Sequence, residues 1–301
     1  MDKDGKSLKA FNYCVSFIDL LGLRKAARGQ GLLPVIDSEE AQRSFERIFR
    51  DNILPIAQLQ RDVEEMAKGL APSPNSPLRQ SLNEKERVRW DEMLNKSVKT
   101  QYWSDGFVRF ACLGDSSVKC QTGGVFEIFC IAGYFCLRGL VLQTPVRGAI
   151  DIAWGVEIRP GELCGPVIAR VYELESEVAQ YPRIVVGQTV LPFLRAHSLN
   201  SGDDPLIRAS RLWAQRCLDM LVQDDDGNWI VHYLGDTFQY SVTHSQHEFL
   251  YGKARDFVAK QVQEHKEKRN SKLAFRYAQL LAYLEAHPPR ASSRPLSGMD
   301  I

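Results

Sequence analysis

The chain has 301 residues, of which 44% are hydrophobic, enough to bury a core as one large domain or a domain with a sizeable appendage. Its 38 Lys and Arg residues almost balance 37 Asp and Glu residues, and a net charge of +1 lacks the basic excess typical of nucleic-acid-binding proteins. The seven cysteines are scattered without a CxxC pair, which favours a reduced, cytoplasmic protein over a disulfide-stabilised one.

The first predicted element is a buried strand over residues 12–18, a short apolar run. It delivers Asp19 to a turn near Gly22. Helices are expected from about Ser38 onward, and the Pro-rich stretch over 71–77 predicts a loop, because proline does not fit a helix interior.

A second aspartate is expected at the tip of a hairpin. Residues 98–104 and 107–112 are rich in β-forming side chains and flank Asp105-Gly106, a dipeptide typical of hairpin turns. Either aspartate alone is better explained as a cap or turn former than as a metal ligand. Two carboxylates on neighbouring strands, each close to a glycine, are instead a suitable site for Mg²⁺, which prefers oxygen ligands.

The middle of the chain predicts a helix over about 125–142, then an alternating strand over 146–154, an acidic helix over 166–180 and a strand over 183–186. Charged residues interrupt the apolar helix and leave it short of the ~20 apolar residues that a membrane span needs, so a buried helix is expected. The element order predicts an α+β fold, an α/β sandwich in which helices pack on a mixed sheet.

Beyond about residue 200 the pattern becomes mostly helical. A hairpin between 229–233 and 238–242 is expected, followed by a helical hairpin or bent helix over 246–285. The expected division is a catalytic domain over 11–199 with an inserted helical and Pro-rich segment at about 51–96, a mostly helical extension over 200–287, and a tail over 288–301 that is disordered by composition.

Four blocks, in order, resemble the class III nucleotidyl cyclases. FIDLLG at 17–22 resembles the family's first metal motif, and SDG at 104–106 resembles its second metal-bearing hairpin. RGAIDIAWG at 147–155 is similar to the family's RxGIxxG strand, and GPVIARVYELE at 165–175 resembles the helix that follows. The last block, with YPR at 181–183, looks closest to the pyrimidine cyclases of the bacterial Pycsar anti-phage system.

The resemblance implies a mainly antiparallel cyclase-like sheet and a metal site. Asp19 and Asp105 would hold two Mg²⁺ or Mn²⁺ ions per active site, with the carbonyl of Leu20 as a further ligand. One ion would activate the ribose 3′-hydroxyl for attack on the α-phosphate, and the other would stabilise the departing pyrophosphate. The family's active sites lie between two protomers, which implies a homodimer. The substrate-binding residues implied are Phe17, Leu21, Gly22, Gln101, Glu162 and Arg147.

The chain departs from the family on the helix that carries the transition-state residues. The family's Asn and Arg fall on Ala169 and Glu173. The missing positive charge would therefore come from Arg170, which we take as the catalytic candidate, or from Arg183 or Arg147.

The base-reading positions also differ. The lysine and aspartate that read a purine in adenylyl cyclases fall on Gln101 and Glu162. Loss of the lysine argues against adenine, whereas a glutamine can pair with uracil or with cytosine.

The sequence thus predicts a nucleotidyl cyclase, a lyase that converts UTP to 3′,5′-cyclic UMP and pyrophosphate as a second messenger in anti-phage defence. A separate effector protein would read the product, and neither a membrane nor a nucleic acid is expected as a partner. A cytidylate cyclase and a catalytically inactive nucleotide-binding regulatory module of the same fold stay open. Metal-dependent phosphohydrolase chemistry is a third possibility, because the same two acids would serve it.

Overall fold

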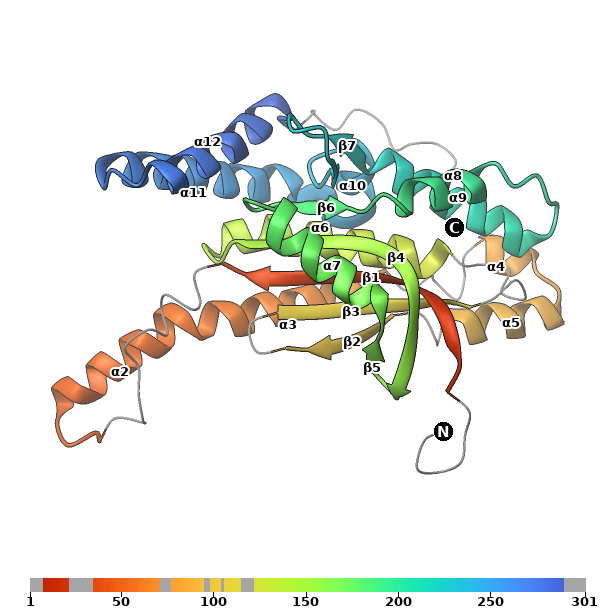
Figure 1. Cartoon of the computed structure of the whole chain (residues 1–301), viewed down its shortest axis with the longest axis horizontal. Helices are drawn as coiled ribbons and strands as arrows, with labels where there is room; N and C mark the ends of the chain where they lie inside the picture. Colours follow the sequence, from red (N-terminus) through yellow and green to blue (C-terminus); the bar gives the residue numbers. More distant parts are fainter. Residues whose placement is uncertain are drawn as a thin grey trace.

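The computed structural model describes residues 8–21, 35–70, 77–94, 98–103, 106–114 and 122–289. Within them, eight strands form one sheet in the order β2-β3-β1-β4-β6-β8-β7, with β5 paired to β4 (Figure 1). Neighbouring strands are antiparallel except β4 and β6, which are parallel. The predicted mixed, mainly antiparallel sheet with packed helices is confirmed.

The strands are β1 (Ala10–Leu20), β2 (Lys99–Tyr102), β3 (Gly106–Gly114), β4 (Val146–Arg159), β5 (Glu162–Cys164), β6 (Ile184–Val186), β7 (Leu221–Gln223) and β8 (Trp229–Val231). The helices are α2 (Glu39–Asn52), α3 (Leu54–Gly69), α4 (Pro77–Ser81), α5 (Glu84–Leu94), α6 (Thr122–Val141), α7 (Pro166–Glu173), α8 (Val190–Ser198), α9 (Pro205–Asp219), α10 (Asp236–Phe238), α11 (His247–Glu267) and α12 (Ser271–Ala286). Short π-helical and 3₁₀ turns complete them: η1 (Leu174–Val178), η2 (Gln239–Thr243) and η3 (His244–Gln246).

Strand β1 lies between β3 and β4, and its side chains alternate between two apolar cores. Cys14 and Ile18 belong to the large core that contains α6, whereas Val15 and Phe17 belong to a smaller core that contains α7. Side chains two residues apart on a strand share a face, so Asp19 continues the row of Phe17 on the α7 side. The end of β1 is thereby fixed between two strands and below one helix.

Helix α6 forms the centre of the large core. Most of its side chains are buried, and it packs against the sheet, α3, α9 and α11. It is the one helix among the described residues that is long and apolar enough to cross a membrane, and 72% of its most apolar window is buried inside the protein. A buried core helix can have the same length and apolar composition as a membrane span. Because most of α6 is buried inside the protein, the expectation of a buried helix here is confirmed.

Residues beyond 200 complete both the sheet and the core. Val185 of β6 pairs with Ile230 of β8, and β8 pairs with β7, so two strands from this region extend the sheet. The region is mostly helical, as predicted, and α11 and α12 form the expected helical hairpin. The predicted pairing of 229–233 with 238–242 is wrong, because β8 pairs with β7 and the second segment is helical.

The inserted segment forms α3 to α5 after α2, and α2 extends away from the sheet (Figure 1). Asp62 Oδ2 of α3 accepts a hydrogen bond of 2.6 Å from Arg138 Nε of α6, which fixes the insertion to the core. The Pro-rich loop falls mainly on 71–76, and the predicted disordered tail falls mainly on 290–301. Both of these ranges lie outside the described residues.

Candidate active site

Asp19 lies at the end of the central strand β1, with Gly106 of β3 on one side and Arg147 of β4 on the other. Arg147 Nη2 lies 3.8 Å from Asp19 Oδ2, and the two side chains are 19% and 17% exposed. Partial burial reduces the screening of this charge pair by water. Both residues were predicted to belong to the site, and the sheet register brings them together.

Glu175 of η1 holds the other side of the same guanidinium. Its carboxylate forms a close ion pair with Arg147 Nε and is almost completely buried. The three groups together carry one net negative charge. The positive charge of Arg147 is therefore offset by the two carboxylates before any ligand binds. Glu175 was not singled out from the sequence. The one feature that could have identified it is a charged residue among the apolar positions of the 165–175 block.

Trp103 and Gly106, which flank the predicted metal residue Asp105 in the sequence, pair with each other next to Asp19. Trp103 N donates to Gly106 O at 2.9 Å, and Gly106 N donates to Trp103 O at 3.4 Å, so Gly106 already belongs to the strand. A Cβ atom on Gly106 would lie 3.0 Å from the Phe17 ring, so a glycine allows β3 to approach β1. Asp105 and Gly22 lie outside the described residues, and their roles stay predictions.

The backbone around the strand end is also fixed. Leu20 pairs with Val146, and Leu21 N donates to Pro145 O at 2.9 Å. The structure therefore fixes the peptide that was predicted to supply a carbonyl ligand, although that role itself stays a prediction.

An aromatic cluster lies on the α7 face next to the site. The buried Phe17 ring lies 5.5 Å from the ring of Trp103 and 5.7 Å from that of Tyr172, measured between centroids. Trp103 and Tyr172 are themselves 38% and 50% exposed. Sequence reasoning predicted Phe17 but missed the two exposed rings, whose strand-end and helix positions meet only in the fold.

Arg170 is bound to a different acid. Its Nε and Nη2 lie 2.8 and 2.7 Å from Asp151 Oδ2, and Asp151 is 1% exposed. The Thr189 hydroxyl and the Ile152 amide donate to the other oxygen of Asp151. Asp151 lies four residues along β4 from Arg147, which corresponds to ~13 Å of strand. Arg170 thus shares the sheet face of Asp19 but is anchored well away from it.

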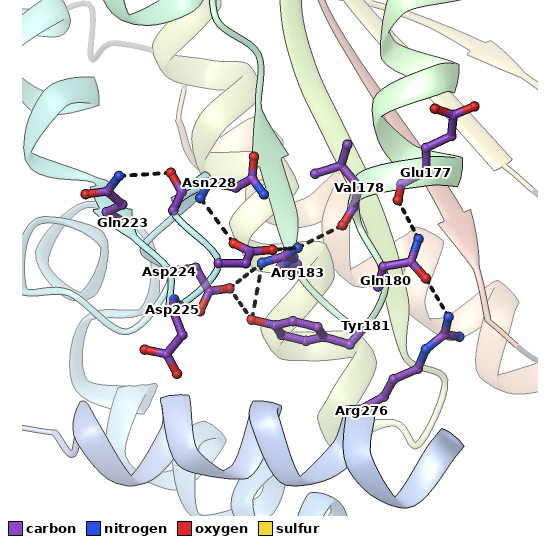
Figure 2. Close-up of polar contacts among 12 residues, drawn as sticks. Glu177, Val178, Gln180, Tyr181, Arg183, Gln223, Asp224, Asp225, Asn228 and Arg276 are labelled. Carbon is purple, nitrogen blue, oxygen red and sulfur yellow. Dashed lines mark hydrogen bonds and ion pairs between the residues drawn. The ribbon is translucent and has the colours of Figure 1, made fainter. Parts of the chain in front are cut away.

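Arg183 is buried in a network of its own (Figure 2). Its Nη1 and Nη2 each lie 2.5 Å from a carboxylate, those of Asp224 and Asp226, and Nη2 also donates to Val178 O at 2.8 Å. Burial opposes the charge, but the two carboxylates outweigh it and raise the pKa of Arg183. The hydrogen bond from Arg183 lowers the pKa of Asp226 to about 2. Arg183 therefore joins η1, β6 and the β7–β8 turn, and only Arg147 of the three candidate arginines adjoins Asp19.

The two predicted base-reading positions are brought into one neighbourhood. Gln101 Oε1 of β2 accepts a hydrogen bond of 3.2 Å from the amide of Leu163, the residue after Glu162 on β5. Because a backbone N–H is a donor, the oxygen of the Gln101 amide must face it, and the Nε2 group remains as a donor. Glu162 itself lies 3.8 Å from Arg159 in a mostly exposed pair.

Among the described residues, no group of three or more His, Cys, Asp or Glu side chains is placed to hold a metal ion. Asp19 supplies one carboxylate oxygen donor of the kind that Mg²⁺ prefers, and the net negative charge of its cluster with Arg147 and Glu175 favours a cation. The donor chemistry therefore fits a divalent ion, with Asp105 as the predicted second ligand.

No protein-family model and no curated protein matches the chain. Among solved structures, it aligns with an adenylyl cyclase from P. aeruginosa at 10% identity and a TM-score of 0.37, over 61% of this chain and 80% of that one. A monomeric guanylyl cyclase domain of a fusion protein from the aquatic fungus Blastocladiella emersonii aligns at 11% identity and a TM-score of 0.41, over 75% and 98%. The catalytic core of a rhodopsin-guanylyl cyclase with converted specificity, in complex with ATPαS, aligns at 11% and 0.39 over the same shares. The residues around Asp19 carry the functional inference that follows.

Proposed function

We propose that the chain is a nucleotidyl cyclase that converts UTP to 3′,5′-cyclic UMP and pyrophosphate. The observation that supports this most is the register at the end of β1: Asp19 lies beside Arg147 and opposite Gly106, the residue that follows Asp105. Displacement at a phosphate needs carboxylates for metal ions and a cation for phosphate oxygens, held on rigid elements.

In this proposal Asp19, Asp105 and the Leu20 carbonyl hold two Mg²⁺ or Mn²⁺ ions. When bound, such ions lower the pKa of the ribose 3′-hydroxyl and stabilise the leaving pyrophosphate. Arg147 binds phosphate oxygens. Glu175 occupies its Nε, so its remaining donors are available on the Asp19 side, and the fixed fork of a guanidinium suits phosphate geometry.

The hydrogen bond of Gln101 favours uracil over cytosine. Its oxygen faces the Leu163 amide, so it offers the base an N–H donor. Uracil presents an acceptor at O4, whereas cytosine presents an amine at the same position. Glu162 would complete the recognition by accepting from the N3–H of uracil.

The wider setting of the proposal comes from the same resemblance. The enzyme would act in the cytoplasm as a homodimer with active sites at the interface, and cyclic UMP would be a second messenger read by a separate effector during phage infection. The 165–175 block and the YPR that follows support this assignment over a purine cyclase.

A second candidate is a catalytically inactive module that binds a nucleotide. Ala169 and Glu173 stand where the family has its transition-state residues. Arg170 and Arg183, the candidate replacements, are engaged with buried or partly buried carboxylates. Such a module would bind the nucleotide without turnover.

The test is to incubate the purified protein with UTP, CTP, ATP or GTP and Mn²⁺ and to identify products by mass spectrometry. Cyclic UMP supports the proposal. Cyclic CMP formed only from CTP would change the proposed substrate from UTP to CTP. Intact nucleotide that is bound but not converted indicates the regulatory module. Linear nucleotide indicates a phosphohydrolase, and either of these last two results overturns the cyclase.

A further inference from the structure

Trp103 lies in the same row of the sheet as Asp19 and Arg147. It follows β2 directly and pairs with Gly106, which pairs with Asp19 in turn. Asp19 then pairs with Arg147. Neighbouring strands lie about 4.8 Å apart, so the backbone of Trp103 is about 10 Å from that of Asp19. Gly106 places no side chain between them, and the Trp103 ring packs on Phe17, on the face that Asp19 shares.

Gln101 lies in the next row, on the same face. It pairs with Val108, and Val108 pairs with Phe17. Gln101 precedes Trp103 by two residues, which corresponds to about 7 Å along a strand. The exposed Trp103 ring therefore lies beside the amide that is proposed to read the base, on the side towards the carboxylate that is proposed to hold metal ions.

Tyr172 of α7 adds a second ring to this face. Trp103 and Tyr172 both pack on the buried Phe17 ring, from β2 and from α7, and both keep much of their own surface in contact with water. Large aromatic rings contribute most when they are covered. Two exposed rings fixed on one buried ring, next to a candidate nucleotide site, are suited to contact a flat ligand.

We propose that the nucleobase of the substrate stacks on the exposed ring of Trp103, with Tyr172 as a second aromatic wall. This rests on the proposed function and deepens it, because it names the surface that holds the base. A base on Trp103 can present its edge to the Nε2 group of Gln101. Stacking uses the π face that every base has, so Trp103 supplies affinity while Gln101 chooses between bases.

The first test measures binding of 3′-deoxy-UTP by calorimetry with Mn²⁺. This analogue lacks the hydroxyl that attacks the α-phosphate, so it binds without turnover. We expect Trp103→Ala to weaken binding by about tenfold, the usual effect of removing a ring on which a base stacks, and Trp103→Phe to keep most of the affinity. Binding of 3′-deoxy-CTP should weaken by the same factor, so the preference between the two bases stays unchanged.

Trp154→Ala is the matched control. Trp154 is also exposed, but it continues the row of Ile150 and Ile152 of β4, which belong to the large core on the opposite face of the sheet. This variant should bind 3′-deoxy-UTP as the wild type does.

Tripolyphosphate with Mn²⁺ separates stacking from a structural role, because it carries the phosphates without a base. Trp103→Ala should bind it as the wild type does. Tyr172→Ala should also bind it normally and should weaken binding of 3′-deoxy-UTP by several-fold. Because the Tyr172 side chain is half exposed, its thermal unfolding midpoint should stay close to that of the wild type. Tyr172→Ala therefore decides the inference even if Trp103→Ala does not fold.

Wild-type affinity for 3′-deoxy-UTP in both alanine variants, or no binding of this analogue by the wild type, overturns the inference. An equal loss of affinity for tripolyphosphate also overturns it, because the rings would then support the phosphate site or a contact between protomers. Failure of the proposed function is seen separately, in the products formed from UTP. A chain that binds 3′-deoxy-UTP through Trp103 but makes no cyclic product would retain the base site and lose the cyclase.

Discussion

Asp19 and Arg147 face each other across β1 and β4, with 3.8 Å between Oδ2 and Nη2, while Glu175 contacts the opposite side of the same guanidinium. Arg147 is therefore shared between two acids and neutralises neither completely. The cluster can attract a cation at Asp19 and still present guanidinium donors to an anion. Both properties are needed for a metal-bound nucleoside triphosphate.

Replacing Asp19 with Asn should abolish cyclization of UTP. The amide keeps the shape of the side chain but loses the charge that holds a metal ion. The loss should exceed the ~10–100-fold that follows removal of groups that only support metal ligands. Product formation with Mn²⁺ is the readout, and Asp203→Asn, an exposed site in a loop, is the control. Activity within a few-fold of wild type would remove Asp19 from the mechanism.

Replacing Glu175 with Gln should weaken metal binding, so that activity needs a higher Mg²⁺ concentration. Without its buried partner, Arg147 would turn its charge toward Asp19 and compete with the cation there. We expect the Mg²⁺ concentration for half-maximal activity to rise by ~10-fold, as is usual for residues that orient ligands. Glu177→Gln, an exposed acid in the same turn, should leave this concentration unchanged, and an equal rise in both variants would contradict the explanation.

Replacing Gln101 with Glu should shift the preference between UTP and CTP. One carboxylate oxygen can still accept from the Leu163 amide, but the other now offers the base an acceptor instead of a donor. That acceptor repels O4 of uracil and pairs with the amine of cytosine. The ratio of kcat/KM for UTP over CTP should fall by at least ~10-fold, since mismatched polar groups discriminate strongly. Gln246→Glu, an exposed position far along the chain, controls for the added charge; an unchanged ratio in Gln101→Glu would remove Gln101 from base recognition.

Asp226→Asn should remove a stabilisation that is present at neutral pH and absent in acid. Arg183 lowers the pKa of Asp226 from 3.8 to about 2, so the folded chain binds a proton there less readily than the unfolded chain. The contribution to the free energy of unfolding is complete above the unfolded pKa and disappears as the pH falls from about 4 to about 2. Urea unfolding should therefore show the largest difference between variant and wild type near neutral pH and a smaller one in acid. Asp225→Asn is the control on the same turn, and a difference that does not vary with pH would contradict the mechanism.

Much of the fold could be predicted because its longer elements carry clear patterns. The buried run of β1, the alternation of β4 and the apolar length of α6 each depend on residues close together in the sequence. β7 and β8 could not be paired correctly, since each has three residues and three residues hold almost no periodicity. Their pairing is decided by the free edge of β6, which the sequence does not reveal.

The candidate site, like the fold, could be predicted only in part. Asp19 and Arg147 could be singled out from local motifs, and the register then places them side by side. The engagement of Arg170 and Arg183 with aspartates could not be foreseen, because those partners lie 19 to 43 residues away in the sequence.

The burial of α6 also has a consequence for synthesis on the ribosome. The helix ends at Val141, whereas α9 and α11, which cover it, begin at Pro205 and His247. At the usual rate of about 5–20 residues per second, the faces of this membrane-like helix that α9 and α11 cover stay exposed on the nascent chain for several seconds before those helices exist. This interval is when the chain is most exposed to aggregation or capture by chaperones, and shortening the C-terminal region would make the exposure permanent.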